Sequence, residues 1–262
     1  MNAIITTGRK MQKSSVELAE EIAVKLKIPF ITRDNLSIRE LAKLYQVNNV
    51  LILKNGALRL ISNVEEIFFH PSLSHLRIKS INNGAGDRMI EAMNLQNGMS
   101  ILDCTLGLGT DAIVESFIAG AEGQVTALEI NPLLAEVVSY GLQHFNDESA
   151  KIITAMRRIK VINTDYADFL KNSADNSFDV IYFDPMFRHS LERSSNLKPL
   201  RSIVDHRPVT VDVIKEAKRV ARKRVVIKEN AKSAEFKRLG FEEIYGGKYS
   251  PIQYGILKIL EN

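Results

Sequence analysis

The sequence has one cysteine and no tryptophan among its 262 residues. A single cysteine excludes an internal disulfide framework and any zinc site built only from cysteines. Long apolar runs are also missing, because no stretch approaches the roughly 18 uninterrupted apolar residues of a membrane-spanning helix. Residues 1–15 contain only a short apolar run, so we expect no secretory leader. These absences predict a cytoplasmic protein with no membrane partner.

The composition is that of a chain able to fold. Hydrophobic residues make up 45% of it, and 35 Lys and Arg against 31 Asp and Glu leave a net charge of +4. This apolar fraction excludes disordered and fibrous chains. With a typical domain size of about 150 residues, the length allows one large domain or two unequal ones. So small a net charge permits a nucleic-acid partner without requiring one.

Apolar runs rich in β-branched residues alternate with amphipathic segments along nearly the whole chain. This alternation is typical of a parallel sheet covered by helices, so the predicted fold class is α/β with a Rossmann-like sheet. The pattern divides into a small α/β domain over residues 1–64, a connector with one helix over 65–98, and a larger domain over 99–262.

The first part is expected to contain two helices and a hairpin. Ser37 and Glu40 have the spacing of a capping box, and Asn55-Gly56 is a favoured hairpin turn. The predicted elements are strands at 3–6, 29–31, 50–53 and 58–61 and helices at 14–26 and 37–45.

The larger part alternates strands and helices in regular order. Strands are predicted at 100–103, 125–129, 160–163, 179–183, 224–228, 241–245 and 254–259, and helices at 111–119, 132–144, 211–221 and 231–238. The stretch of about 25 residues from Pro185 to Val209 lacks periodicity. Loops of that length inside compact domains tend to be functional or disordered.

A strand running into a glycine-containing turn and a helix is the strongest local motif, in the sequence Asp103-Cys104-Thr105-Leu106-Gly107-Leu108-Gly109-Thr110-Asp111. Gly107 and Gly109 let the backbone approach a ligand closely, and the following helix presents free amides. Glu129 ends the next strand about 20 residues later, where a carboxylate accepts hydrogen bonds from both ribose hydroxyls. The pair predicts a cofactor of the adenosine type.

The charges around the turn separate two such cofactors. A dinucleotide site usually has a third glycine, which is missing here. Asp103 and Asp111 would repel a diphosphate but attract the sulfonium and ammonium groups of S-adenosylmethionine. The alternative is that these two acids only cap a turn and a helix, in which case Glu129 would be a coincidence. Cys104 is interpreted as a packing residue.

Two further strand ends carry candidate site residues. Asp165 and Tyr166 follow the third strand, where one interpretation is that they contact an adenine. The local sequence supports equally well a helix cap at Asp165 and a core tyrosine at Tyr166. The fourth strand leads into Asp184-Pro185-Met186-Phe187, the arrangement of enzymes that methylate exocyclic amino groups of bases. In that role Asp184 and the Pro185 carbonyl accept the amino hydrogens while Phe187 stacks on the base. The alternative is an ordinary loop.

Positive charge is concentrated in one segment. Residues 214–238 contain ten basic and three acidic side chains, a net charge of +7 that leaves −3 for the rest of the chain. Such a segment predicts contact with RNA phosphates, and an ordinary solvated helix face is the alternative. The predicted RNA contacts are Arg77, Lys79, Arg188, Lys218, Arg219, Arg222, Lys223 and Lys228.

Three stretches resemble those of the ribosomal RNA small-subunit methyltransferase J family. They are the glycine turn from Asp103 to Asp111, the tetrapeptide from Asp184 to Phe187, and Arg224-Val225-Val226-Ile227-Lys228. The resemblance covers about residues 75–260 and implies a seven-stranded methyltransferase sheet and methylation of guanine N2 in 16S rRNA, on free RNA or the small ribosomal subunit. The S-adenosylmethionine contacts that it implies are Thr110, Asp111, Glu129, Ile130, Asp165, Tyr166 and Asp184. The family usually has other residue types at Thr110, Ile130, Asp165, Tyr166 and Arg188.

Other functions fit the sequence less well. The five histidines show no metal-ligand spacing, so no metal is expected. A methyltransferase for a small molecule or a DNA base, a non-catalytic RNA-binding protein with the same fold and, more remotely, a dehydrogenase remain as alternatives. The sequence makes no prediction of the oligomeric state.

Overall fold

The computed structural model of the protein describes residues 2–9, 12–63, 65–185 and 203–259. Contacts divide the chain into two units. The smaller comprises Met1–His70, Asn131–Asp147 and Glu192–Val204, and the larger comprises Pro71–Ile130, Glu148–Leu191 and Asp205–Asn262. Within the described ranges, no helix combines the length and the apolar character needed to cross a membrane.

The smaller unit contains a four-stranded sheet in the order β1-β2-β3-β4. The turn between β2 and β3 has Asn55 at φ 52° and Gly56 at φ 72°, which confirms the predicted hairpin. The Ser37–Glu40 capping box also forms. The elements are β1 (Ala3–Thr7), α1 (Lys13–Leu26), α2 (Ile38–Leu44), β2 (Asn49–Lys54), β3 (Ala57–Ser62) and β4 (Glu65–Phe68).

Two local predictions for this sheet are wrong. The strand expected at 29–31 is reduced to a single bridge between Phe30 and Ile5, and residues 31–33 lead without regular structure into a turn at 34–35. The edge strand β4 was not predicted, because its sequence Glu-Glu-Ile-Phe buries only Ile67 and so carries little apolar signal.

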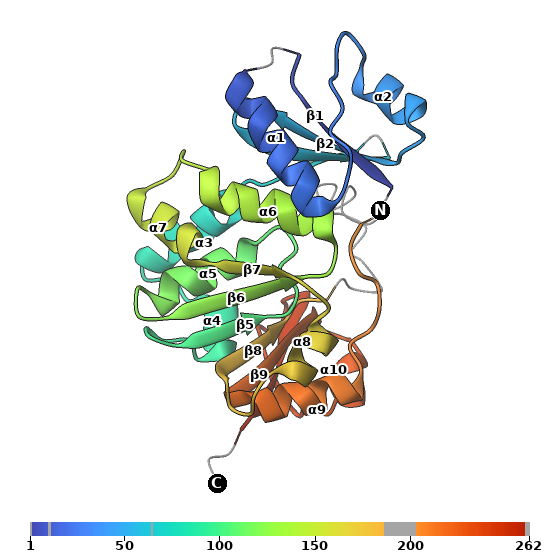
Figure 1. The fold of residues 1–262 in the computed structure, drawn as a ribbon. Coiled ribbons are helices and arrows are strands. Elements are labelled where there is room, and N and C mark those ends of the chain that lie inside the picture. Colours follow the sequence, from blue (N-terminus) through green and yellow to red (C-terminus); the bar gives the residue numbers. More distant parts are fainter. Residues whose placement is uncertain (1, 10–11, 64, 186–202, 260–262) are drawn as a thin grey trace. The chain divides into compact units, whose positions relative to one another are not determined.

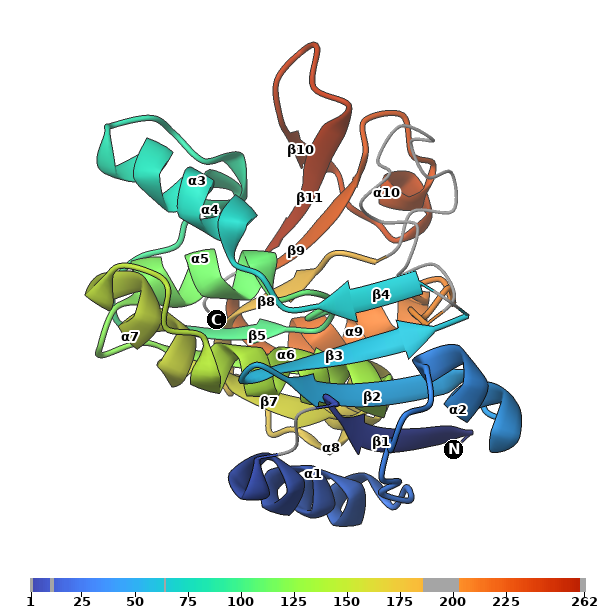
Figure 2. The same cartoon turned by 90° about the horizontal axis from the view of Figure 1, so that it is seen from above.

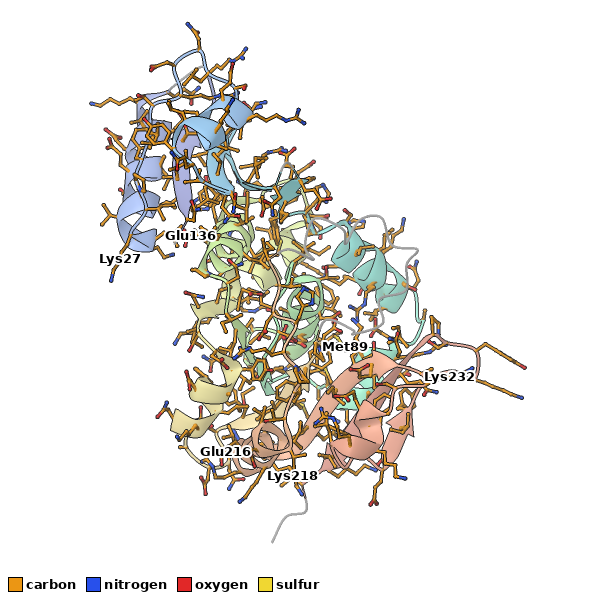
Figure 3. All side chains as sticks on the ribbon, turned by 90° about the vertical axis from the view of Figure 1, so that its right-hand side faces the viewer. Lys27, Met89, Glu136, Glu216, Lys218 and Lys232 are labelled. Carbon is orange, nitrogen blue, oxygen red and sulfur yellow. The ribbon has the colours of Figure 1, made fainter. Side chains whose placement is uncertain are left out.

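Helix α6 (Pro132–His144) belongs to the smaller unit although it follows a strand of the larger sheet in the chain. Its Glu136 forms an ion pair with Lys25 of α1 at 2.5 Å; Figure 3 labels Glu136 on this helix. Gly141 lies against the Phe69 ring, where a β-carbon would come to 2.2 Å from the ring carbon Cγ. The glycine therefore permits the close packing of α6 on this unit.

The larger unit is built on a seven-stranded sheet in the order β10-β11-β9-β8-β5-β6-β7, which confirms the predicted Rossmann-like methyltransferase sheet. Its central strands are parallel, and β11 pairs with β9 in antiparallel register. The strands are β5 (Ser100–Asp103), β6 (Gln124–Glu129), β7 (Lys160–Asn163), β8 (Phe178–Phe183), β9 (Ala221–Asn230), β10 (Glu243–Tyr245) and β11 (Ile252–Lys258).

Helices cover both faces of this sheet, with α8 and α9 on one face and α5 and α7 on the other (Figure 1). Residues of β8 alternate between the faces, and Phe183 packs in the cluster that includes Val213 and Ala217 of α9. The helices are α3 (Ser72–Asn82), α4 (Arg88–Met93), α5 (Thr110–Ala119), α7 (Ala150–Arg158), α8 (Tyr166–Asn172), α9 (Val211–Val220) and α10 (Glu235–Arg238).

The strand order reverses between β5 and β8. From β5 the chain continues to β6 on one side, whereas β8 lies on the other side of β5. In open α/β sheets, ligands bind at the carboxyl ends of the strands at such a reversal. The fold therefore places the residues that follow β5 and β8 at its binding edge.

Candidate active site

Asp103 and Asp184 stand at the carboxyl ends of the two strands that flank the reversal. Asp103 pairs with Tyr182 in the parallel register, and β8 ends at the next residue, Phe183. Thr105 links the two strand ends, because its backbone N donates to Asp103 Oδ1 at 2.9 Å and its Oγ1 accepts from the Asp184 backbone N at 2.6 Å. Thr105 thus holds the carboxyl ends of β5 and β8 together.

The glycine turn leaves the start of α5 open. Gly107 and Gly109 have φ of 51° and 77°, the left-handed region that other residues rarely adopt. Gly109 occupies the N-cap position, so the N-cap residue has no side chain to accept a hydrogen bond from the first turn of α5. Thr110 begins the helix, with its carbonyl held by Ser74 Oγ at 3.0 Å. Free amides beside acidic side chains fit an amino-acid moiety with both charges.

Glu129 ends β6 and is 7% exposed. Its backbone carbonyl is bound by Asn163 Nδ2 at 2.7 Å and by the Thr164 backbone N at 3.1 Å, which fixes this strand end. The next residue, Ile130, has an exposed side chain, and its backbone carbonyl accepts a hydrogen bond from the same Asn163 amide at 3.0 Å. A carboxylate here, one strand from the glycine turn, fits the ribose of an adenosine.

Asp165 and Tyr166 lie at the start of α8. Asp165 caps this helix through the Ala167 backbone N at 2.7 Å and forms an ion pair with Arg207 at 2.8 Å. Tyr166 packs edge-on against Phe183 with the ring centroids 5.7 Å apart, and burial raises its pKa to about 12. Both residues therefore have structural contacts of the kind that their alternative interpretation predicts.

Asp111 is the centre of an ionic network at the site. Its Oδ2 accepts from the Tyr182 hydroxyl at 2.8 Å and from Lys228 Nζ at 3.1 Å, and its Oδ1 accepts from Arg77. Burial acts to raise the pKa of Asp111, but these two cations hold it well below its usual range. Asp111 is therefore an ionised side chain.

Lys228 joins this network to Asp184. Its Nζ lies 2.6 Å from Asp184 Oδ2, and the two carboxylates raise its pKa against the opposing effect of burial. Burial raises the pKa of Asp184 to about 6, with Lys228 acting in the opposite direction and Asp111 adding to the rise. The Asp184 side chain is 28% exposed, so it is accessible to a ligand.

Two carboxyl groups beneath this network are buried. Burial raises the pKa of Asp103 to about 8, and it raises the pKa of Glu115 on α5 well above its usual range. Neither Glu115 oxygen accepts a hydrogen bond from the described residues, and its side chain is fully buried. Glu115, Thr105 and Tyr182 join the site without having been predicted from the sequence. The two-residue spacing of Tyr182 from Asp184, which places both on one strand face, is a sequence signal for Tyr182.

Burial of the Glu115 carboxyl group predicts how the stability of the protein depends on pH. Because its pKa is raised in the folded state, the free energy of unfolding falls as pH rises above the ordinary glutamate range. Glu115→Gln should therefore raise the melting temperature by about 3 °C or more at pH 8, and by less at pH 5. Calorimetry of both proteins at the two pH values measures this. The exposed Glu122 provides the control as Glu122→Gln, and an equal gain at both pH values contradicts the argument.

The residues predicted to contact RNA fall into different settings. Arg77 and Lys228 are part of the ionic network. Arg219 is bound to Asp175, Glu216 and backbone carbonyls of the neighbouring helix, and Arg222 and Lys223 both pair with Asp179. Exposed side chains are found at Lys79 and Lys218. Met186, Phe187 and Arg188 lie outside the described residues.

A pocket of about 790 Å³ adjoins the site. Pro185, next to Asp184, forms part of its wall, together with Ile227, Glu229 and Asn230 toward the carboxyl end of β9. The remaining wall comes from residues 206–209, 231–235 and 248–251. Its volume is in the range of pockets that hold small ligands.

Comparison with known proteins identifies the family. Residues 36–244 match the family model described as "Putative SAM-dependent methyltransferase". The chain belongs to this methyltransferase family. S-adenosylmethionine is therefore its cofactor, as predicted, and the glycine turn with the acids around it fits that molecule. The described residues contain no cluster able to hold a metal ion.

Relatives of this methyltransferase include proteins with and without an assigned reaction. The protein YpiP of Bacillus subtilis is 34% identical, with 97% of this chain and 99% of that protein covered. Ribosomal RNA small subunit methyltransferase J of Marinobacter nauticus is 29% identical over 57% of this chain and 55% of its own length. The methyltransferase thus spans about half the length of that relative.

A solved structure shares the fold. A SAM-dependent methyltransferase from Neisseria gonorrhoeae is 16% identical, covers 98% of this chain with 96% of its own, and has a TM-score of 0.63. At this identity the likeness concerns the fold of the methyltransferase alone.

Glu129 allows the cofactor contact to be tested. If its carboxylate binds the ribose hydroxyls, Glu129→Ala should weaken S-adenosylmethionine binding by about 10- to 100-fold, the loss expected for hydrogen bonds to a charged group. Isothermal calorimetry with the cofactor and with its demethylated product measures this. Glu122→Ala, an exposed acid before β6, serves as the matched control. Equal affinities for all three proteins contradict the assignment.

Proposed function

We propose that this methyltransferase transfers its methyl group to an exocyclic amino group of a nucleobase, guanine N2 in 16S rRNA. The observation that carries the proposal is Asp184, a partly exposed carboxylate that follows β8 at the strand reversal, is held by Lys228 at 2.6 Å and is followed by Pro185 in the pocket wall. The relatives named ribosomal RNA small subunit methyltransferase J support RNA as the substrate.

The chemistry assigns a role to each group. An exocyclic amino nitrogen is a poor nucleophile because its lone pair is conjugated with the ring. Asp184 and the Pro185 carbonyl accept hydrogen bonds from the amino group, which turns the lone pair out of conjugation and aims it at the methyl group. The methylated nitrogen then gives up one proton to the Asp184 carboxylate or to water. When bound, S-adenosylmethionine supplies an electrophilic methyl on a sulfonium. Positioning then provides most of the rate, since transfer needs no covalent enzyme intermediate.

Lys228 and Asp111 position Asp184 in this proposal. Lys228 is bound by both carboxylates, and Asp111 is fixed in turn by Tyr182 and Arg77. The chain of charges runs through side chains of α3, α5, β8 and β9, so that four elements fix the orientation of one carboxylate. A positively charged neighbour keeps Asp184 ionised and able to accept hydrogens near neutral pH.

The substrate is tested in cells that lack the protein. Nucleoside mass spectrometry of their 16S rRNA should show the loss of one N2-methylguanosine, restored by the native gene and not by an Asp184→Ala copy. An unchanged set of modified nucleosides contradicts the proposal. Transfer of labelled methyl groups in vitro to DNA or to small molecules, but not to RNA, favours the alternative substrates.

A further inference from the structure

The pocket beside Asp184 has a rim of basic and aromatic side chains. The rim is formed by the segment that joins β9 to α10 and by the loop between β10 and β11. The Ala231 backbone N donates to the Pro251 carbonyl at 2.9 Å, so these two segments lie side by side. Figure 2 shows the β10–β11 hairpin next to the connection from β9 to α10. Lys232 belongs to the first segment, and Lys248 and Tyr249 belong to the second.

The rim lysines are available to a ligand. Lys232 and Lys248 are exposed, and neither forms an ion pair with any side chain in the described ranges. A third cation of the pocket, Arg207, is instead held by Asp165 and Asp205. Of the acids in the wall, Glu235 is paired with Arg238 and Glu229 is 8% exposed. The accessible charge of the rim is therefore positive.

Tyr249 adds a stacking surface to this charge. It is 89% exposed, the highest value among the exposed large hydrophobic side chains of the described residues. Lys248 Nζ lies 5.6 Å from the centre of its ring, within the range of a cation–π contact. Proteins bind single-stranded nucleic acids with positive side chains along the phosphate backbone and exposed aromatic rings on which the bases stack.

The basic segment on α9 and the start of β9 contrasts with the rim. Arg219, Arg222 and Lys223 neutralise acids of their own unit. Figure 3 shows Lys218 on α9 and Lys232 at a different edge of the larger unit, beside the β10–β11 loop. The rim, unlike α9, borders the pocket wall that contains Pro185.

We propose that Lys232, Lys248 and Tyr249 bind the single-stranded RNA that flanks the target base, with phosphates on the two lysines and a neighbouring base on the tyrosine. The inference rests on the proposed function, because a base must leave its stack to reach Asp184. An RNA strand whose target base enters the pocket passes over this rim, so the RNA that the rim binds is also the substrate of the reaction.

Binding without the reaction tests the proposal. The probe is a fluorescein-labelled single-stranded RNA of about 12 nucleotides, within the site sizes of single-strand binders. Fluorescence polarisation is measured over a range of salt concentrations. Lys232→Ala with Lys248→Ala should weaken binding by at least about tenfold at 0.1 M salt and reduce the slope of log K against log salt by about 1.4, because each phosphate contact contributes about 0.7. Tyr249→Ala should weaken binding by about 5- to 150-fold at little change in slope.

Matched variants make the result specific. Lys151→Ala with Lys171→Ala removes the same charge from exposed positions on α7 and α8 and should leave affinity and slope unchanged. Calorimetry with S-adenosylmethionine should give native affinity for every variant, which verifies the fold. If Lys218→Ala weakens binding and the rim variants do not, RNA lies on α9 and the proposal is overturned. Competition by polyglutamate as effective as that by RNA identifies an acidic-peptide site and also overturns it.

The two proposals fail in different ways. If the protein binds RNA through the rim but methylates no RNA, the proposed RNA surface stands and the proposed function is contradicted. A protein that methylates RNA at the native rate and KM in the rim variants retains the proposed function and loses the RNA surface.

Discussion

Asp184→Ala should lower the rate of methyl transfer at saturating cofactor and RNA by at least about 100-fold, the smaller end of what a positioned acid–base group contributes. The carboxylate is held by Lys228 at the end of β8 and is partly exposed at the pocket. Without it, the amino nitrogen of the target base keeps its lone pair in conjugation. Single-turnover transfer of labelled methyl groups to RNA measures the loss.

The companion variants separate chemistry from folding. Asp168→Ala removes an exposed acid from α8 and should transfer methyl groups at the native rate. Asp184→Asn keeps an acceptor oxygen but not the charge, so its rate should fall between those of the native protein and Asp184→Ala. Melting temperatures within a few degrees of the native protein establish that all three fold. Activity of Asp184→Ala within threefold of native removes Asp184 from the reaction.

Local signals in the sequence predict much of the fold. The capping box of Ser37 and Glu40 and the turn at Asn55-Gly56 depend only on neighbours in the chain, and both form. The buried β-branched runs similarly give every strand of the larger sheet to within a few residues. Helices α3, α7 and α8 were not predicted, because short helices with a narrow apolar face owe most of their stability to tertiary packing.

The ion pairs of the site could not be predicted from local sequence patterns, because they join residues far apart in the chain. Lys228 reads as one more cation in a basic segment, yet its ammonium lies between Asp111, 117 positions earlier in the chain, and Asp184. Arg77 likewise reaches Asp111 across 34 positions. The sequence predicts that Asp111 and Asp184 share a strand-end site because parallel strands end at one edge. It does not predict which cations the fold brings to them, since Lys228 comes from β9, the parallel neighbour of β8, and Arg77 comes from α3, which packs near α5.

The pH dependence of the reaction should depend on Lys228. Burial raises the pKa of Asp184 to about 6 in the protein without ligands. An ionised Asp184 accepts the amino hydrogens and a protonated one does not, so kcat/KM for the cofactor, which reports groups of the free enzyme, should rise with pH through about 6 and become constant above it. Initial rates of labelled methyl transfer between pH 5 and pH 9 give the profile.

Removing the cation should move this profile. In Lys228→Met the attraction that favours the ionised form is lost, so the acidic limb should shift upward by about 1 to 3 pH units, the usual effect of an opposite charge at this distance. Lys228→Arg retains the charge and should keep the limb near its native position even where the rate falls. Lys171→Met, an exposed lysine on α8, should leave both limb and rate unchanged.

The direction of the shift distinguishes an electrostatic role from a structural one. A lysine that only fills space at the end of β9 would lower the rate of Lys228→Met at every pH and leave the limb in place. A lysine that binds RNA phosphate would raise the KM for RNA without moving the limb. Only a cation that acts on the Asp184 carboxylate moves the limb upward in Lys228→Met and holds it in Lys228→Arg, because the pKa of the acid depends on the charge at Nζ, 2.6 Å from its Oδ2.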